Sequence, residues 1–356
     1  MKKALIAMSG GVDSSVSALI MKNRGYECVG CTMKLHDSNE SIVAEDDSQT
    51  CLTESDIADA KAVCDRMGMN HYTFNLKDEF REGVIDKFVN CYLCGRTPNP
   101  CVECNDQFKF SRLYEKAQEL GCDYVVTGHY ARIVERDGSF HLCTAPDPGK
   151  DQSYVLYRLS QEQLSHTLFP LGDMGKDETR TLAEKNGFIN ANKKDSQDIC
   201  FVPDGDYASV IRKYTDTTIE PGDFVDMSGN VIGRHKGIIH YTIGQRKGLG
   251  ISWDSPLYVV RIDVENNRVV LGSNDDLFTD TLTADDARWT MTTPPTQPFN
   301  AQVRVRYHGK NVPAVVTPAG NNTFTVKFEE PVRAITPGQA AVIYSGDEVL
   351  GGGTIR

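Results

Sequence analysis

Long hydrophobic runs are absent from this 356-residue sequence, and none approaches the roughly 20 apolar residues that a membrane-spanning helix requires. The first apolar stretch, residues 3–7, is interrupted at Ser9-Gly10-Gly11, which is too early for a signal peptide and fits a first strand. Basic residues are also few: 38 Lys and Arg face 49 Asp and Glu, which argues against a protein that coats nucleic acid over its whole surface. We therefore expect a cytoplasmic protein of about two or three domains with no membrane partner.

Cysteine, in contrast, is abundant. The 11 cysteines are an odd number in a chain with no export signal, so reactive thiols or a metal explain them better than a disulfide framework. Two C-x-x-C pairs, at 91–94 and 101–104, resemble zinc ligands but are closer together than in most zinc ribbons. Cys200 follows Lys193 and Lys194, and a basic neighbourhood can lower the pKa of a thiol. The remaining cysteines are interpreted as packing residues: Cys28, Cys31, Cys51, Cys64, Cys122 and Cys143.

The first 200 residues alternate between strand and helix patterns. This alternation predicts an α/β fold with a doubly wound, mostly parallel sheet, in which ligands bind beyond the carboxyl ends of the strands. An acidic stretch at 37–59 is expected to form a solvated loop that leads into a helix. The predicted strands are 3–7, 27–33, 71–76 and 124–127, and the predicted helices are 14–23, 57–67, 79–91 and 108–120.

After residue 203, short alternating strands separated by Gly, Pro and Asn replace the helical patterns. We predict three domains: a catalytic domain at 1–203, a small β-containing central domain at 204–275 and a C-terminal β-barrel at 276–356. Residues 290–298 are expected to form a linker or long loop. The predicted strands are 257–263, 267–271, 302–307, 323–328 and 340–344.

The string Ser9-Gly10-Gly11-Val12-Asp13-Ser14-Ser15 follows the first strand and opens the first helix. Its glycines permit a tight turn, and the amides at a helix start attract an anion. Neither the Walker sequence nor the dinucleotide G-x-G-x-x-G pattern is present. The string resembles the PP-loop of ATP pyrophosphatases, which adenylate a carbonyl oxygen and release pyrophosphate.

A series of further motifs extends this resemblance over nearly the whole chain. After the loop come TPNPCVECN at 97–105, TGHYAR at 127–132, KDQSY at 150–154, SQDICF at 196–201, YTIGQRKGLG at 241–250, PGQ at 337–339 and LGGG at 350–353. In this order they resemble the bacterial tRNA-specific 2-thiouridylases. The resemblance implies ATP-dependent conversion of the C2 carbonyl of the wobble uridine to a thiocarbonyl, with AMP and pyrophosphate as products.

The same resemblance assigns roles to individual residues. Cys104 would be the nucleophile and Cys200 the carrier of a persulfide sulfur, and a Cys104–Cys200 disulfide could form and need reduction. Asp13 would help to hold Mg²⁺. Asn99, Pro100 and Cys101 would face the target base, although many family members have aspartate at position 101, which puts a carboxylate-dependent proton step in doubt. The implied ATP contacts are Ala7, Met8, Ser9, Gly10, Gly11, Val12, Asp13, Ser14, Met33 and Gly128.

The partners implied are tRNA and a protein that supplies sulfur. Glutamine, glutamate and lysine tRNAs would be the acceptors, and a cysteine desulfurase or a sulfur-relay protein the donor. A basic strand with an aromatic residue can pair a phosphate contact with base stacking, which a base that leaves its stack requires. The candidate tRNA contacts are His129, Lys150, Asp151, Gln152, Arg306, Tyr307 and Gln339.

Three alternatives remain open from the sequence. Cys101, Cys104 and Cys200 could ligate an iron–sulfur cluster. The chain could instead be a PP-loop amide-forming synthetase or a lysidine-type tRNA ligase with structural cysteines, in which SQDICF would be unexplained. A zinc-stabilised RNA-binding protein with a nucleotide-binding loop is the non-catalytic alternative.

Overall fold

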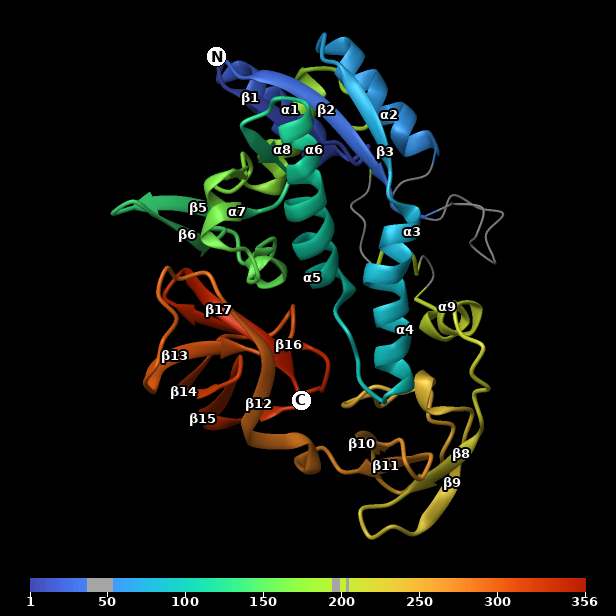
Figure 1. Ribbon diagram of the computed structural model, residues 1–356. Helices are drawn as coiled ribbons and strands as arrows, with labels where there is room; N and C mark the ends of the chain where they lie inside the picture. The colour runs from blue at the N-terminus through green and yellow to red at the C-terminus, as the bar shows by residue number, and fades with distance from the viewer. Residues whose placement is uncertain (37–53, 194–198, 203–204) are drawn as a thin grey trace.

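The computed structural model describes residues 1–36, 54–193, 199–202 and 205–356 (Figure 1). Residues 37–53, with most of the acidic stretch and Cys51, and residues 194–198 of the SQDICF segment lie outside the described residues. Within the described part of the chain, no helix is both long enough and apolar enough to cross a membrane.

A parallel sheet forms the core of the N-terminal part, as predicted. Its strand order is β3-β2-β1-β4-β7, and every neighbouring pair is parallel. Side chains alternate across β1: Leu5 packs in the core on one face, while Ala4 and Ile6 pack on the other. The strands are β1 (Lys3–Ala7), β2 (Glu27–Lys34), β3 (His71–Asn75), β4 (Tyr124–Val126) and β7 (Thr167–Leu168).

Helices cover both faces of this sheet. Two of the predicted helices have other bounds in the structure, and the helices at 161–165, 176–185 and 207–213 were not predicted. The helix expected at 79–91 spans 77–93 and contains a π-type segment at 81–85. The helix expected at 108–120 begins eight residues earlier, at Pro100, because proline suits the first turn of a helix. The helices are α1 (Val12–Asn23), α2 (Glu54–Arg66), α3 (Lys77–Phe80), α4 (Asp86–Leu93), α5 (Pro100–Cys104), α6 (Leu113–Glu119), α7 (Gln161–Ser165), α8 (Lys176–Lys185) and α9 (Tyr207–Lys213), with π-type segments η2 (Arg81–Ile85) and η3 (Asn105–Arg112) and 3₁₀ turns η4 (Ser153–Leu156), η5 (Ile238–His240) and η6 (Asp275–Leu277).

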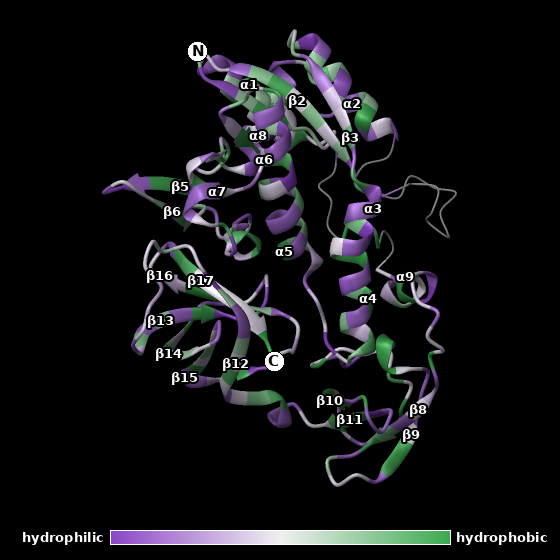
Figure 2. Cartoon of the chain, viewed as in Figure 1, coloured by the Kyte–Doolittle hydropathy of each residue, from purple (hydrophilic) through white to green (hydrophobic). Residues whose placement is uncertain are grey.

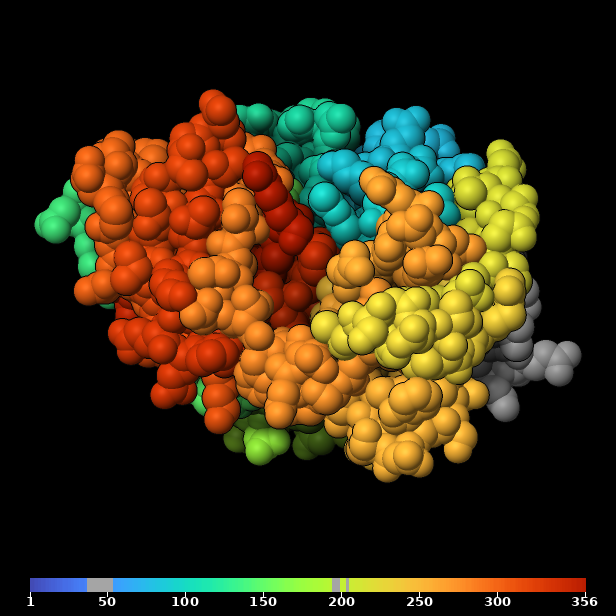
Figure 3. All heavy atoms as spheres, turned by 90° about the horizontal axis from the view of Figure 1, so that it is seen from below, coloured from blue at the N-terminus to red at the C-terminus, as the bar shows by residue number. Residues whose placement is uncertain are grey.

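Two further sheets follow in the chain. A small central sheet has the strand order β10-β11-β8-β9. The barrel runs β12-β15-β14-β13-β16-β17 and closes through pairing of β12 with β17. Figure 3 shows barrel and central sheet side by side, with the cyan segment around α4 between them. The strands are β8 (Gly222–Val225), β9 (Val231–His235), β10 (Tyr258–Asp263), β11 (Arg268–Gly272), β12 (Phe278–Trp289), β13 (Phe299–Arg304), β14 (Val312–Gly320), β15 (Thr323–Arg333), β16 (Ala340–Ser345) and β17 (Glu348–Ile355).

The predicted α/β sheet, central β domain and terminal barrel are thus confirmed, whereas the borders after 203 and 275 stay predictions. The expected strand at 302–307 is wrong in its second half, because β13 ends at Arg304 and Arg306 and Tyr307 lie in the turn that follows. Residues 290–298 form the expected loop, but it connects two strands of the barrel, β12 and β13, and does not link two domains.

The sequence prediction missed a hairpin that connects the N-terminal part to the barrel. It consists of β5 (Ala131–Arg136) and β6 (Ser139–Thr144), and β6 pairs with β17 of the barrel. Figure 2 shows hydrophilic residues at its tip and hydrophobic residues nearer its base. The parallel sheet and the barrel are therefore joined by backbone pairing as well as by side-chain packing.

Candidate active site

A cavity of about 290 Å³ lies at the carboxyl ends of β1, β2 and β4. It collects residues from the loop after β1, from α5 and from residues 199–201, which are far apart in the sequence. This is the edge of a parallel sheet at which ligands are expected. Its lining includes Ala7, Met8, Ser9, Asp13, Ser14, Met33, Pro100, Cys101, Cys104, Lys109, Gly128, His129, Gln152 and Cys200.

The loop after β1 is shaped for close approach to an anion. Gly10 has a φ of +71°, and a Cβ at this position would lie 2.5 Å from the carbonyl oxygen of Asp56. The Ser14 hydroxyl accepts a hydrogen bond from the Ser9 amide at 3.2 Å and donates to the Gly11 carbonyl at 3.0 Å. Because α1 begins at Val12, the first amides of this helix have no partner within it and are available to a phosphate.

Gly128 brings the end of β4 against this loop. A Cβ on Gly128 would lie 2.9 Å from the Asp13 carbonyl carbon and 3.0 Å from the Ser14 amide nitrogen. The backbone can approach the loop this closely only without a side chain. Gly128 and Met33 both border the cavity.

Asp13 already has a cationic partner. Its two carboxylate oxygens accept hydrogen bonds from the Lys176 ammonium at 2.7 and 2.8 Å, and one of them accepts another from the Tyr130 hydroxyl at 2.8 Å. Lys176 therefore already offsets the negative charge that Asp13 would offer to a magnesium ion. Lys176 was missed by the sequence reasoning, since nothing in its local sequence relates it to a residue 163 positions away.

The two cysteines that the motifs singled out line the same cavity. Cys104 is buried on α5, Cys101 is exposed one turn earlier, and Cys200 is half-buried. Cys101, Cys104 and Cys200 are near one another, but among the described residues no group of three or more His, Cys, Asp or Glu side chains is arranged to hold a metal ion. What the structure shows is that all three thiols border one cavity.

Of the two lysines expected near Cys200, Lys194 lies outside the described residues and Lys193 is bound to another element. The Lys193 ammonium donates to Asp59 at 2.8 Å and also binds Asp56, both on α2, so its charge is neutralised there. Lys109, from the π-type segment η3, lines the cavity instead. The sequence reasoning missed Lys109. It lies five residues after Cys104, and only the wider π-type winding relates two positions at that spacing.

Other cysteines are buried away from this cavity, and burial raises the pKa of their thiols. It raises the pKa of Cys28 and Cys143 to about 11 and that of Cys64 to about 12, and it raises the pKa of Cys122. Cys31, which does border the cavity, is fully buried and also has a raised pKa. Such thiols hold their protons at neutral pH, in agreement with a packing role.

Three family models match the chain in succession. They are described as the tRNA methyl transferase HUP domain at residues 2–204, the tRNA methyl transferase PRC-barrel domain at 208–273 and the aminomethyltransferase beta-barrel domain at 279–355. A protein of Clostridioides difficile, named tRNA-specific 2-thiouridylase MnmA, is 47% identical over 100% of this chain and 98% of its own. One from Carboxydothermus hydrogenoformans, with the same name, matches at the same identity and coverage. The chain belongs to the MnmA family of tRNA-specific 2-thiouridylases.

These matches confirm the MnmA family and the enzyme class that the motifs predicted. Among solved structures, a complex of a 4-thiouridine synthetase with RNA and bound ATP is similar with a TM-score of 0.36 and 17% identity, over 60% of this chain and 49% of that chain. This similarity is too slight to add to the assignment, which depends on the full-length relatives.

Several residues proposed to contact tRNA are buried. Asp151 forms an ion pair with Arg304 at 3.2 Å and accepts a hydrogen bond from the Ser153 hydroxyl at 2.9 Å. His129 shares a hydrogen bond of 2.7 Å with the Thr127 hydroxyl, and burial lowers its pKa well below the usual range. Gln152 accepts from the Tyr130 amide at 2.9 Å, and both His129 and Gln152 line the cavity.

The remaining candidates lie nearer the surface. Arg306 donates to the Arg333 carbonyl, and the half-buried Tyr307 ring packs edge-on against Tyr154 with 6.0 Å between centroids. Lys150 is partly exposed in the loop after β6. Their role in binding tRNA stays a prediction.

Gln339 positions the segment proposed to face the target base. Its amide donates to the carbonyls of Thr97 and Pro98 at 2.9 and 3.1 Å, and the Thr97 amide donates to the Pro337 carbonyl at 2.8 Å. This segment leads into Asn99, which borders a second cavity of about 120 Å³ beside α4 and the barrel. The barrel thus holds the loop that precedes Cys104.

Proposed function

We propose that this protein catalyses the ATP-dependent 2-thiolation of the wobble uridine, U34, of tRNA. The observation that carries the proposal is the single cavity that joins the anion-binding loop to Cys104 and Cys200. The names of the full-length relatives support a uridine of tRNA as the substrate. Glutamine, glutamate and lysine tRNAs are the proposed acceptors, and a cysteine desulfurase or relay protein the proposed sulfur donor.

ATP would bind with its pyrophosphate portion on the loop. The amides at the start of α1 and the hydroxyls of Ser9 and Ser14 suit phosphate oxygens, and Lys109 adds a positive charge in the same cavity. Met33 and Gly128 would border the adenine. The residues present therefore fit ATP, and Mg²⁺ bound to its phosphates would further offset their charge.

Adenylation is needed because the C2 carbonyl of uridine is a poor electrophile with a poor leaving group. In the proposed sequence, the O2 atom attacks the α-phosphate of ATP and pyrophosphate leaves. The terminal sulfur of a persulfide on Cys200 then attacks C2. The Cys104 thiolate attacks the Cys200 sulfur, which breaks the persulfide bond, leaves the terminal sulfur on C2 and expels AMP. The resulting Cys104–Cys200 disulfide is reduced by an external thiol.

Nucleoside analysis tests this mechanism directly. Purified protein is incubated with ATP, a persulfide donor and unmodified tRNA, and 2-thiouridine is measured by mass spectrometry. We expect Cys104→Ser and Cys200→Ser each to reduce 2-thiouridine about 10³-fold or more, because the Cys200 thiol carries the transferred sulfur and the Cys104 thiol releases it. Binding of ATP, measured by titration, should stay at the wild-type level.

Cys28→Ser serves as the matched control, because Cys28 does not line the cavity and burial raises the pKa of its thiol to about 11. It should thiolate tRNA at the wild-type rate. Full thiolation by Cys104→Ser or Cys200→Ser would contradict the mechanism, because that thiol would then be needed neither to carry nor to release the sulfur.

A further inference from the structure

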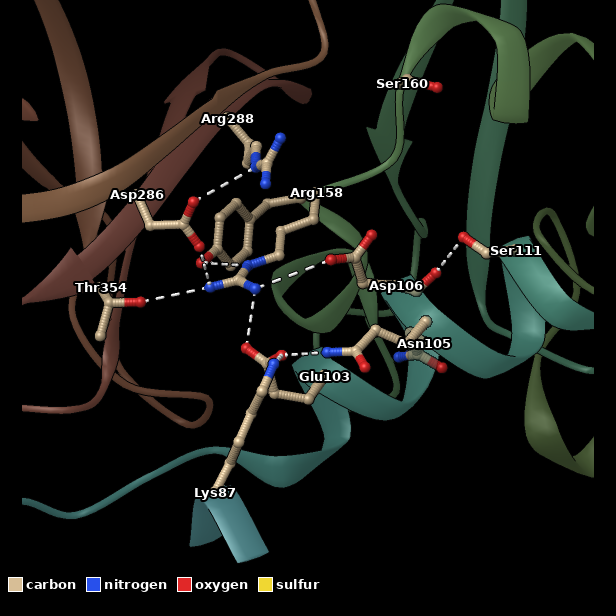
Figure 4. A network of polar contacts seen from close by, with 12 residues as sticks. Lys87, Glu103, Asn105, Asp106, Ser111, Arg158, Ser160, Asp286, Arg288 and Thr354 are labelled. Carbon is tan, nitrogen blue, oxygen red and sulfur yellow. Dashed lines mark hydrogen bonds and ion pairs between the residues drawn. The ribbon is translucent and has the colours of Figure 1, made fainter. Parts of the chain in front are cut away.

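Arg158 lies between the helix that carries Cys104 and the barrel (Figure 4). Its side chain is only 8% exposed. On the side of the catalytic helix, its Nη1 donates to Glu103 at 2.7 Å and lies 3.7 Å from Asp106. Glu103 and Asp106 flank Cys104 in the sequence, so the guanidinium binds the turn on which the thiol sits.

The other end of the guanidinium binds the barrel. Its Nη2 lies 2.9 Å from the Asp286 carboxylate on β12 and donates to the Thr354 hydroxyl on β17 at 3.3 Å. Asp286 has a φ of +50° and lies where the pairing of β12 with β17 shifts register. This irregularity interrupts the strand at the place where Asp286 meets Arg158.

A buried guanidinium with this arrangement is suited to fixing two elements against each other. It is always charged, its planar fork presents several donors in fixed directions, and a buried charge stays paired because the loss of its partners is costly. A displacement of the barrel by an ångström would therefore be passed to Glu103 and Asp106. The contacts of Arg158 join Asp286 on β12 and Thr354 on β17 to the helix of the proposed nucleophile.

We propose that Arg158 is a positioning residue that sets the distance between the barrel and Cys104, so that a tRNA held by the barrel presents its uridine to the thiol. This inference depends on the proposed function. Arg158 does not touch the reacting atoms. It acts through Glu103, Asp106 and Asp286, and its loss should slow the thiolation step rather than weaken the binding of tRNA.

Asp286→Asn tests the barrel end of this link. Asparagine tolerates the positive φ and keeps the side-chain shape, so what is lost is the negative charge that pairs with Arg158 and, at 3.4 Å, with Arg288. Asp285→Asn is the matched control, since the neighbouring Asp285 pairs with Arg356 within the barrel. We expect Asp286→Asn to lower kcat for 2-thiouridine formation about tenfold, because a small misplacement of reacting groups is costly, with KM for tRNA changed less than about twofold. Asp285→Asn should keep the wild-type kcat.

Arg158→Lys provides a second variant that retains the charge but not the fork. It should also lower kcat with little change in KM for tRNA. All rates are measured well below the midpoint of thermal unfolding of each variant. Equal kcat for Asp286→Asn and Asp285→Asn would overturn the proposal. So would a decrease in the kcat of Asp286→Asn that is fully explained by a smaller fraction of folded protein. Absence of 2-thiouridine with the wild-type protein would instead overturn the proposed function.

Discussion

His129 illustrates how the surroundings of one residue limit its chemistry. The sequence places it in a TGHYAR motif, where a histidine is a natural candidate for a phosphate contact. In the structure its ring lies 5.9 Å from Phe110 and 5.7 Å from Phe169 between ring centroids, and desolvation lowers its pKa well below 6.5. The imidazole is therefore neutral at physiological pH and suited to a hydrogen bond in the cavity rather than to an ion pair.

The lowered pKa of His129 makes the protein less stable in acid. In the folded state the ring stays neutral, whereas in the unfolded state it takes up a proton below about pH 6.5. The unfolded state thus binds more protons, and the stability lost is up to about 1.4 kcal/mol per pH unit below that value. We expect His129→Gln to show a smaller decrease in the midpoint of thermal unfolding between pH 7 and pH 5 than the wild type.

His166→Gln is the control for this measurement, because His166 is partly exposed and stacks on Tyr114. It should lose as much stability between pH 7 and pH 5 as the wild type. A decrease for His129→Gln that equals that of the wild type would contradict the assignment of acid sensitivity to this buried ring.

Residues whose role depends on local sequence could be predicted, and those that act across the fold could not. The loop at 9–15 and the cysteines at 104 and 200 belong to contiguous motifs, and the structure brings them to one cavity. Lys176 and Arg158 have no such local signal, since their partners are more than 50 residues away. Lys193 binds Asp56 and Asp59 on α2, while Lys194 lies outside the described residues, so the effect of this basic segment on Cys200 stays a prediction.

At the scale of elements, the start of α5 depends on the barrel. The turn at Pro337–Gln339 binds the backbone of Thr97 and Pro98, just before Pro100 opens the helix. Gly338 has a φ of +92°, and a Cβ there would lie 2.9 Å from the Thr97 carbonyl oxygen. The barrel turn and the loop therefore fit together at van der Waals contact, which fixes where the helix of Cys104 begins.

Removal of the Gln339 amide should loosen this loop. We expect Gln339→Ala to increase hydrogen exchange in residues 95–104, measured by mass spectrometry, because two backbone carbonyls lose their donor at a cost of about 1–3 kcal/mol. Exchange in α6 should not change. Gln302→Ala, on β13 of the same barrel, is the control, and an equal increase at 95–104 in that variant would show that the effect is not specific to the turn.

Elements were predictable where the hydrophobic pattern is strong. β1 and β2 are largely buried and read as apolar runs, so their positions were found, whereas the two-residue strand β7 was not predicted. The β5–β6 hairpin was missed because its partner, β17, is more than 200 residues away, and its residues alternate weakly. The π-type segments were missed because a helical periodicity does not distinguish them from α-helix.

At the scale of the molecule, the catalytic part and the barrel share a hydrophobic core. One cluster of buried residues combines Phe110, Leu142 and Tyr154 of the N-terminal part with Val342 and Tyr344 of the barrel. The Tyr154 hydroxyl also donates to the Ala340 carbonyl at 2.8 Å. Since neither side can bury this surface alone, the two parts are expected to depend on each other for stability.

Val342 and Val316 allow the shared core to be compared with the barrel's own core. Both are fully buried, but Val342 belongs to the shared cluster and Val316 to the interior of the barrel. Truncation of either to alanine should cost about 2 kcal/mol, because two methyl groups are removed from close packing. We expect Val342→Ala to increase hydrogen exchange in both the barrel and residues 153–159, whereas Val316→Ala increases it in the barrel alone. Wild-type exchange at 153–159 in Val342→Ala would show that the catalytic part is stable without this core, and that the β6–β17 pairing and polar contacts such as those of Arg158 are enough to join it to the barrel.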